Sequence, residues 1–261
     1  MEVKFFQKKS PYKKKCEDAY VRNDTIQVYG VCDGATPLVT CEDENGHNGA
    51  YLASHLFQSY FESLTREEDI VECMVQANHI LANKMKLYNI DQTKKHHLWS
   101  TCFAGVRIGD SAIQYGQLGD CMIVAKFLDG RITLLTKDTV KGINARAQKN
   151  RQERGYDETY YADESRRFIY NRSMANTKDG YSVANGMENV REYIQTGTIK
   201  RSDVKALFMC SDGLFHPTFS LEQVASVVWK DGIEDYVAML EALEQKNGIR
   251  ADDKTALTIM M

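Results

Sequence analysis

The stretch AIQYGQLGDCMIVAKFLDGRITLL, residues 112–135, has the composition of short β-strands. Its β-rich runs are Ala112–Leu118, Met122–Leu128 and Ile132–Leu135. Asp129-Gly130 lies between the last two runs with an apolar stretch on each side, which is typical of a tight hairpin turn. Because a hairpin joins antiparallel strands, this stretch predicts a meander within an antiparallel sheet.

Two further strands and two helices are predicted on the N-terminal side of this meander. The runs Ile26–Cys32 and Leu98–Ile108 are also rich in strand-forming residues. Between them, His47–Leu64 and Glu67–Tyr88 repeat apolar residues with the spacing of an amphipathic helix.

The C-terminal part mixes the same two patterns. The expected elements are a buried strand at Val204–Cys210, a helix capped by Ser220 and running to about Lys230, a helix at Gly232–Gln245 and a last strand at Thr255–Met261. Strands in the middle with helix pairs early and late predict an α+β fold, in which helices cover the outer faces of a sheet sandwich.

The length of 261 residues favours one domain spanning residues 1–261. Residues 140–172 are charged, rich in tyrosine and poor in aliphatic side chains, so they contribute little to a core. We expect this segment to form a surface flap with one short helix near Asn144–Arg154.

The composition excludes several classes of partner. The formal net charge is -3, from 33 basic and 36 acidic residues, which predicts no general affinity for nucleic acid or membranes. Seven cysteines without a Cys-x-x-Cys pair predict reduced thiols in a cytoplasmic protein, and no secretory signal or membrane span is recognisable. We expect a monomer whose partner is selected by a specific site.

Two of the five Asp-Gly pairs differ from ordinary turns. Asp33 ends the apolar run IQVYGVC and Asp212 ends ALFMCS, and neither is followed by the second strand that a hairpin requires. Each pair therefore places a carboxylate at the end of a buried strand, with a glycine that lets the main chain approach a ligand.

Other acidic residues flank predicted strands in the same way. Asp252 and Asp253 precede the terminal run TALTIMM, and Glu17 and Asp18 precede another extended segment. Carboxylates gathered at one end of several strands repel one another unless a cation lies among them, and oxygen ligands favour magnesium or manganese over zinc. Strand-end aspartates also serve as helix caps and turn formers, so the spacing alone leaves both interpretations open.

A series of motifs resembles the protein phosphatase 2C family, and bacterial members in particular. The motifs are CEDAY (16–20), VYGVCDG (28–34), GQLGDC (116–121), LLTKD (134–138), FMCSDGLF (208–215) and DDKTALTI (252–259). They follow the order of the family from Lys13 to Met260, almost the whole chain. The resemblance implies two packed antiparallel sheets flanked by helix pairs, a four-layer αββα sandwich.

The resemblance also implies a site for two Mn²⁺ or Mg²⁺ ions. Asp33 would bridge the two ions, and the carbonyl of Gly34 would complete the shell of the second. Asp212 and Asp252 would bind the first ion.

Further roles follow from the same resemblance. Glu17 and Asp18 match an acidic pair that holds metal-bound waters, and Asp120 matches an aspartate that, with Asp212, can bind a third metal in related enzymes. Lys13 occupies the position of a phosphate-binding arginine. For Asp120 a plain turn residue is the alternative, and for Lys13 a solvated surface lysine.

The implied activity is hydrolysis of phosphoserine or phosphothreonine in proteins by a metal-activated water, without a protein nucleophile. Two rivals stay open: a catalytically silent module that binds phosphoproteins, and a hydrolase for another phosphoester such as a nucleotide.

The sequence departs from the family pattern in several places. Ala35 and Thr36 follow the first Asp-Gly, so the histidine often proposed as general acid is absent there, and Asp253 replaces a usual asparagine. Thr139 stands where the family usually has histidine. His47 could donate a proton instead, but a solvated residue just before a helix is the plainer interpretation.

Overall fold

The computed structural model describes all of residues 1–261 and contains two five-stranded antiparallel sheets. The first sheet has the order β1 (Glu2–Lys8), β10 (Lys254–Met260), β9 (Val204–Cys210), β6 (Met122–Phe127) and β7 (Ile132–Leu134). The second has the order β2 (Ala19–Asn23), β3 (Val28–Gly34), β4 (Thr101–Ile108), β5 (Ala112–Leu118) and β8 (Gln195–Lys200).

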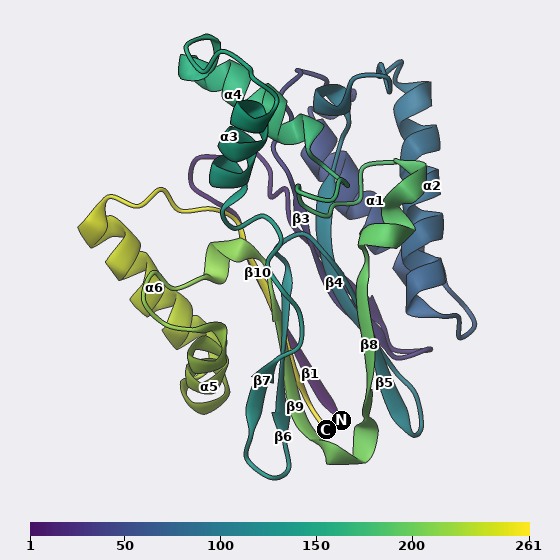
Figure 1. The fold of residues 1–261 in the computed structure, drawn as a ribbon. Coiled ribbons are helices and arrows are strands. Elements are labelled where there is room, and N and C mark those ends of the chain that lie inside the picture. The colour runs from purple at the N-terminus through teal and green to yellow at the C-terminus, as the bar shows by residue number, and fades with distance from the viewer.

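Helix pairs cover the outer faces of both sheets (Figure 1). α1 (Gly49–Ser63) and α2 (Ile70–Leu87) lie against the second sheet, and α5 (Leu221–Asp231) and α6 (Ile233–Asn247) lie against the first. The predicted α+β sandwich with four layers is therefore confirmed.

Three hydrophobic clusters fill the spaces between the four layers. The central cluster contains Val31 and Val106 from the second sheet together with Leu207 and Leu257 from the first. A second cluster packs α1 and α2 on the second sheet, and a third packs α5 and α6 on the first. Burial of apolar surface on both faces of each sheet explains why strands such as VYGVCDG are almost continuously apolar.

Most local predictions agree with the structure. The β6–β7 hairpin turns at Asp129-Gly130, where Gly130 has a φ of 90°. Ser220 forms a capping box at the start of α5, because its side chain accepts from the Gln223 amide while the Gln223 side chain accepts from the Ser220 amide. α1 and α2 begin two to three residues after the predicted starts, since Asn48 and Asp69 cap them.

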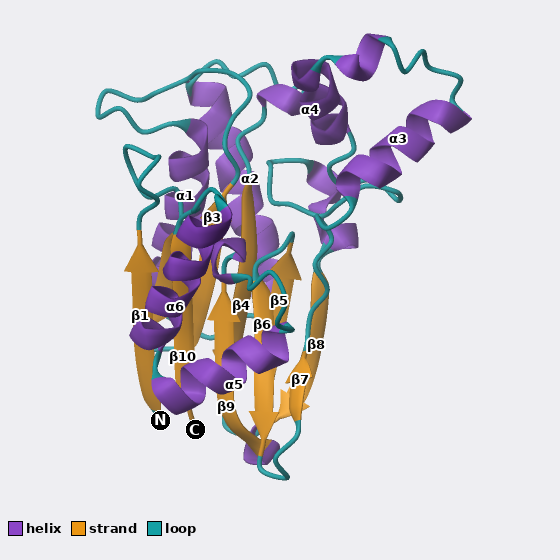
Figure 2. Cartoon of the chain, turned by 90° about the vertical axis from the view of Figure 1, so that its left-hand side faces the viewer, coloured by secondary structure: helices purple, strands orange, loops and turns teal.

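The segment between β7 and β8 contains α3 (Ile143–Glu153) and α4 (Glu164–Ser173). Both helices stand at the end of the sandwich opposite the two chain termini (Figures 1 and 2). Short 3₁₀ turns, including Asp212–Leu214 after β9, occur in the connections. No helix has the length and apolarity that crossing a membrane requires.

Candidate functional site

Strand register brings the acidic motifs of the first sheet to one end of it. Cys210, the last residue of β9, pairs with Met122 at the start of β6 and with Ala256 near the start of β10. Asp212 follows β9, whereas Asp120 and Asp252 precede β6 and β10. These three carboxylates therefore lie at the same end of the sheet.

The second sheet contributes its carboxylates at the same end of the sandwich. Ala19, the first residue of β2, pairs with Cys32 of β3, so Asp18 lies beside Asp33. Besides burial, the charges of Asp18, Asp212 and Asp120 raise the pKa of Asp33, in agreement with one acidic centre to which both sheets contribute. Asp120 lies where the chain passes from β5 in one sheet to β6 in the other.

The turn after β3 depends on a glycine. A Cβ atom on Gly34 would lie 2.4 Å from the carbonyl oxygen of Ala50 and 2.6 Å from that of Glu17. The Gly34 amide donates to the Glu17 carbonyl at 3.2 Å, and the Thr101 hydroxyl donates to the Asp33 carbonyl at 2.9 Å. Any other residue at position 34 would thus push the acidic centre apart.

Burial and mutual repulsion raise the pKa values of the central carboxyls. Burial, then the charges of Asp18 and Asp212, raises the pKa of Asp33 well above its ordinary value. Burial, then the charge of Asp252, also raises the pKa of Asp212. Burial, with the charge of Asp212, raises the pKa of Asp120 to about 7.

Asp18 and Glu17 are held by side chains that the sequence analysis did not identify. The hydroxyl of Ser211 donates to Asp18 at 2.7 Å, and burial raises the pKa of Asp18 to about 7 despite that bond. Glu17 accepts from the hydroxyl of Thr36 at 3.1 Å and from the carboxamide of Asn48. In the sequence, Ser211 is marked only by its place next to Asp212, and Asn48 only by its position as the N-cap of α1.

Lys13 lies inside the acidic centre rather than in solvent. Its ammonium group is 2.6 Å from Asp252, 3.0 Å from Glu17 and 3.1 Å from Asp253. Burial alone would lower the pKa of Lys13, but its hydrogen bonds to Asp252 and Glu17 outweigh that effect and raise it. Because an ammonium has three N–H donors, all of them are directed at carboxylates.

Asp253 organises the segment that carries Lys13. Its buried carboxylate accepts from the amides of Ser10 and Glu17, both at 2.7 Å. The Asp253 amide donates to the Asp252 carboxylate at 2.7 Å. The carboxylate at this position therefore connects the N-terminal segment to the turn before β10.

Other predicted or neighbouring groups lie at the edge of the centre. His47, expected in solvent, is half-buried: its Nδ1 is 3.0 Å from Asp43 and its ring stacks on Tyr51. From α4, the Arg172 guanidinium donates to the Thr36 carbonyl at 2.8 Å and to the Ser100 hydroxyl at 3.0 Å. This residue, which the sequence analysis missed, joins the segment between β7 and β8 to the loop after Asp33.

The donor chemistry of the centre fits a divalent cation. The side chains alone form no group of three or more His, Cys, Asp or Glu residues arranged to hold a metal ion. The resemblance, however, counts the Gly34 carbonyl and waters among the ligands, so fewer side chains per ion are needed. Repulsion between the buried carboxyls contributes to their raised pKa values, and a bound cation would relieve that repulsion.

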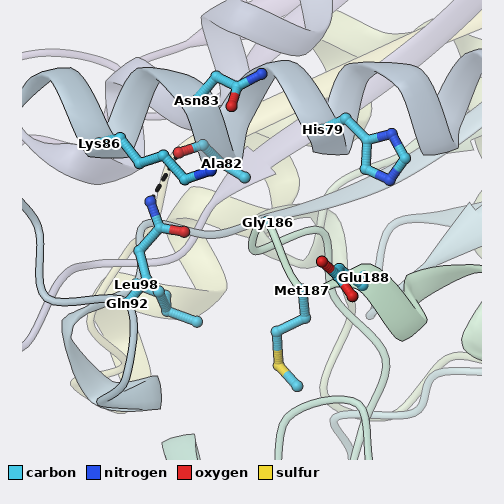
Figure 3. A pocket seen from close by; sticks show the side chains of 9 residues that line it. All are labelled: His79, Ala82, Asn83, Lys86, Gln92, Leu98, Gly186, Met187 and Glu188. Atoms are coloured by element: carbon cyan, nitrogen blue, oxygen red, sulfur yellow. Dashed lines mark hydrogen bonds between the residues drawn. The ribbon is translucent and has the colours of Figure 1, made fainter.

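One pocket of the structure lies away from the acidic centre. It has a volume of about 650 Å³ and is lined by side chains of α2, the loop after it and the segment around Gly186 (Figure 3). His79, Lys86 and Glu188 face it, and none of the predicted site residues does. We therefore assign the candidate site from the convergent carboxylates.

Fold and site together define a class, that of αββα sandwiches with an acidic centre at one end of the sheets. The chain belongs to the protein phosphatase 2C family, whose model matches residues 11–254. No curated protein matches the sequence.

Solved structures of bacterial phosphatases share the fold. Serine/threonine phosphatase Stp1 from Staphylococcus aureus is 18% identical, with a TM-score of 0.63 over 100% of this chain and 94% of its own. Serine/threonine phosphatase PstP from Mycobacterium tuberculosis is 14% identical, with a TM-score of 0.62 over 99% and 98%. PppA from Pseudomonas aeruginosa is also 14% identical, with a TM-score of 0.63 over 98% and 96%.

Proposed function

We propose that the protein is a metal-dependent phosphatase that hydrolyses phosphoserine and phosphothreonine in proteins. The observation that carries this proposal is the convergence of Asp33 and Asp212 from different sheets at one end of the sandwich, where burial and neighbouring charge raise both pKa values. Membership of the protein phosphatase 2C family supports the reaction class.

The proposed cofactors are two Mn²⁺ or Mg²⁺ ions. Asp33, the Gly34 carbonyl, Asp212 and Asp252 would hold them, with Glu17 and Asp18 acting through waters. A catalytic domain of PstP with 14% identity has been solved in complex with two manganese ions, which supports this stoichiometry. When bound, such ions lower the pKa of a water nucleophile and neutralise charge on the phosphoryl oxygens.

The chain itself would position groups rather than attack the phosphorus atom. The five buried cysteines have no activated thiolate: burial raises the pKa of Cys210, for example. Ala35 offers no proton to a leaving group, so we propose that water protonates the departing alkoxide. Lys13 stays a candidate for phosphate contact. For this contact, one N–H donor of its ammonium group must first break its hydrogen bond to a carboxylate.

We propose phosphoproteins as partners, a monomeric state and a cytoplasmic location. The names of the similar structures, which are serine/threonine phosphatases, support the substrate class. The unpaired cysteines support a reducing compartment.

The test is hydrolysis of p-nitrophenyl phosphate and of phosphoserine peptides, with Mn²⁺ and after exhaustive chelation. We expect turnover with Mn²⁺ or Mg²⁺ and none after EDTA, with recovery when metal returns. Full activity in protein that elemental analysis finds free of metal would refute the mechanism. Binding of phosphopeptides without turnover under any metal would favour the silent binding module instead.

A further inference from the structure

A buried ion pair lies directly behind the acidic centre. Lys254, the first residue of β10, is only 1% exposed, and its ammonium nitrogen lies 3.0 Å from each carboxylate oxygen of Glu244 in the last turn of α6. The same ammonium donates to the main-chain carbonyl of Asp252 at 3.5 Å. Its three N–H donors therefore all have acceptors.

The side chain of Lys254 also contacts the turn that carries Asp212. A Cβ atom built on Gly213 would lie 3.4 Å from Cγ of Lys254 and 1.9 Å from the carbonyl oxygen of Asp253. The main chain after Asp212 is thus packed against the start of β10. Lys254 touches both turns that present the two proposed ligands of the first metal ion.

An ammonium group in this place is costly unless it is paired. An isolated buried charge is strongly disfavoured, whereas an apolar pair of similar volume often leaves stability unchanged. Among the other buried side chains of β10, Ala256, Leu257 and Ile259 are apolar and Thr255 is polar but uncharged, so Lys254 is the only buried charge on this strand. The contact that an apolar side chain could not make is the hydrogen bond to the Asp252 carbonyl.

We propose that Glu244 and Lys254 are positioning residues for the metal site. Glu244 orients the ammonium from α6, and Lys254 fixes the turn before β10 against the Asp212-Gly213 turn, so that Asp212 and Asp252 face the same ion. This inference rests on the proposed function for its consequence on metal binding, but the positioning of the two turns is measurable without metal.

The chain contains a matched control pair. Lys8 is the cross-strand neighbour of Lys254 on β1, and its ammonium contacts Glu241 of α6 at 2.7 Å. The side chains of Lys8 and Glu241 are 51% and 35% exposed, and neither forms a hydrogen bond or ion pair with the two turns. Removing this pair disrupts the same helix–sheet connection without touching the acidic centre.

The test compares the double variant Glu244→Leu/Lys254→Met with the control Glu241→Leu/Lys8→Met. Hydrogen exchange of the segments 211–215 and 248–254 is measured without metal, and Mn²⁺ affinity is measured by calorimetry. For the first variant we expect a melting temperature close to that of wild type, faster exchange in both segments and an Mn²⁺ affinity weakened about 10-fold or more, as for other residues that support metal ligands. The control should match wild type.

Exchange and Mn²⁺ affinity equal to those of the control would overturn the proposal and leave the pair with a purely structural role. If wild type itself binds no Mn²⁺, the proposed function fails, and the exchange data alone decide whether the pair positions the turns. If the double variant does not fold, Lys254→Arg keeps the charge but changes the contact with the Asp252 carbonyl, and the same measurements and criteria apply to it.

Discussion

Asp33 and Asp212 lie close enough that, besides burial, the charge of Asp212 raises the pKa of Asp33, although one residue ends a strand of the second sheet and the other follows a strand of the first. Two buried carboxylates this close together repel each other, so the protonated form is favoured over that in water. A divalent cation between them would offset that repulsion, which makes this pair the most direct structural argument for a metal site.

Replacing either aspartate by asparagine should remove turnover while keeping the fold. Asp33→Asn and Asp212→Asn should each lower kcat by about 1,000-fold or more, equivalent to about 4 kcal/mol of transition-state stabilisation. The metal-free variants should be at least as stable as wild type, because a repulsive charge is lost. Steady-state hydrolysis of p-nitrophenyl phosphate and thermal unfolding measure the two effects.

Asp129→Asn is the matched control, since Asp129 belongs to an Asp-Gly pair in the β6–β7 hairpin. It should keep wild-type activity. Near-normal rates in folded Asp33→Asn and Asp212→Asn would place the chemistry at another site.

The stability of the metal-free protein should depend on pH. The pKa values of Asp18 and Asp120 are raised to about 7 by burial and neighbouring charge. A carboxyl that binds its proton more tightly in the folded state stabilises that state fully below about pH 4, the ordinary pKa, and this stabilisation is lost as the pH rises through about 7. In EDTA, the melting temperature should therefore fall over this interval.

Asp120→Asn and added Mn²⁺ isolate this contribution from that of the surface groups. Between pH 4 and 7.5, the free energy of unfolding should fall by about 2 kcal/mol less for the variant than for wild type. This corresponds to a difference of roughly 4–8 °C in melting temperature. Added Mn²⁺ should restore the melting temperature of wild type at pH 7.5. Parallel curves for the two proteins in EDTA would show that Asp120 ionises normally.

The variant Lys13→Met distinguishes two roles of Lys13: balancing the charge of the acidic centre and binding phosphate. Because its ammonium lies among three carboxylates, we expect Lys13→Met to destabilise the metal-free protein by about 2 kcal/mol, as for loss of one partner from a partly buried ion pair. The KM for p-nitrophenyl phosphate should change little. A KM increase of 10-fold or more, about 1.4 kcal/mol, with unchanged stability would instead identify Lys13 as a phosphate contact.

Strong apolar runs made much of the fold predictable. The predicted bounds Ala112–Leu118 and Val204–Cys210 are those of β5 and β9, since these strands bury most of their side chains. Three elements were not predictable in this way: β1 and β8, which lie at sheet edges, and α4, which buries no residue. Edge strands and exposed helices lack a clear apolar period because solvent covers much of their surface.

The acidic residues of the site were predictable because strand ends and family motifs mark them. Their supporting contacts were not: Ser211 reaches Asp18 and Asn48 reaches Glu17 across loops far apart in sequence. Lys13 was expected near phosphate or in solvent, and only the tertiary structure reveals its three carboxylate neighbours. Sequence patterns report local burial, whereas these contacts depend on how separate loops meet.

Asp120 decides whether the site extends to a third ion. Its carboxylate is buried, and burial together with the charge of Asp212 raises its pKa, so it is more than an exposed turn residue. We expect a shared ion with few protein ligands to bind weakly and to fill only at high metal concentration.

Asp120→Ala should therefore keep the fold and the two core ions but lower kcat, most strongly on phosphopeptides. Calorimetric Mn²⁺ titration should show the loss of a weak binding phase while the tight phase remains. The measurement is turnover across a range of Mn²⁺ concentrations for the variant and wild type, with Asp129→Ala as the control for loss of a turn aspartate. Identical turnover of Asp120→Ala and wild type at every Mn²⁺ concentration would leave Asp120 as a turn residue only, because a carboxylate that binds a catalytic ion cannot be removed without changing the metal dependence of the rate.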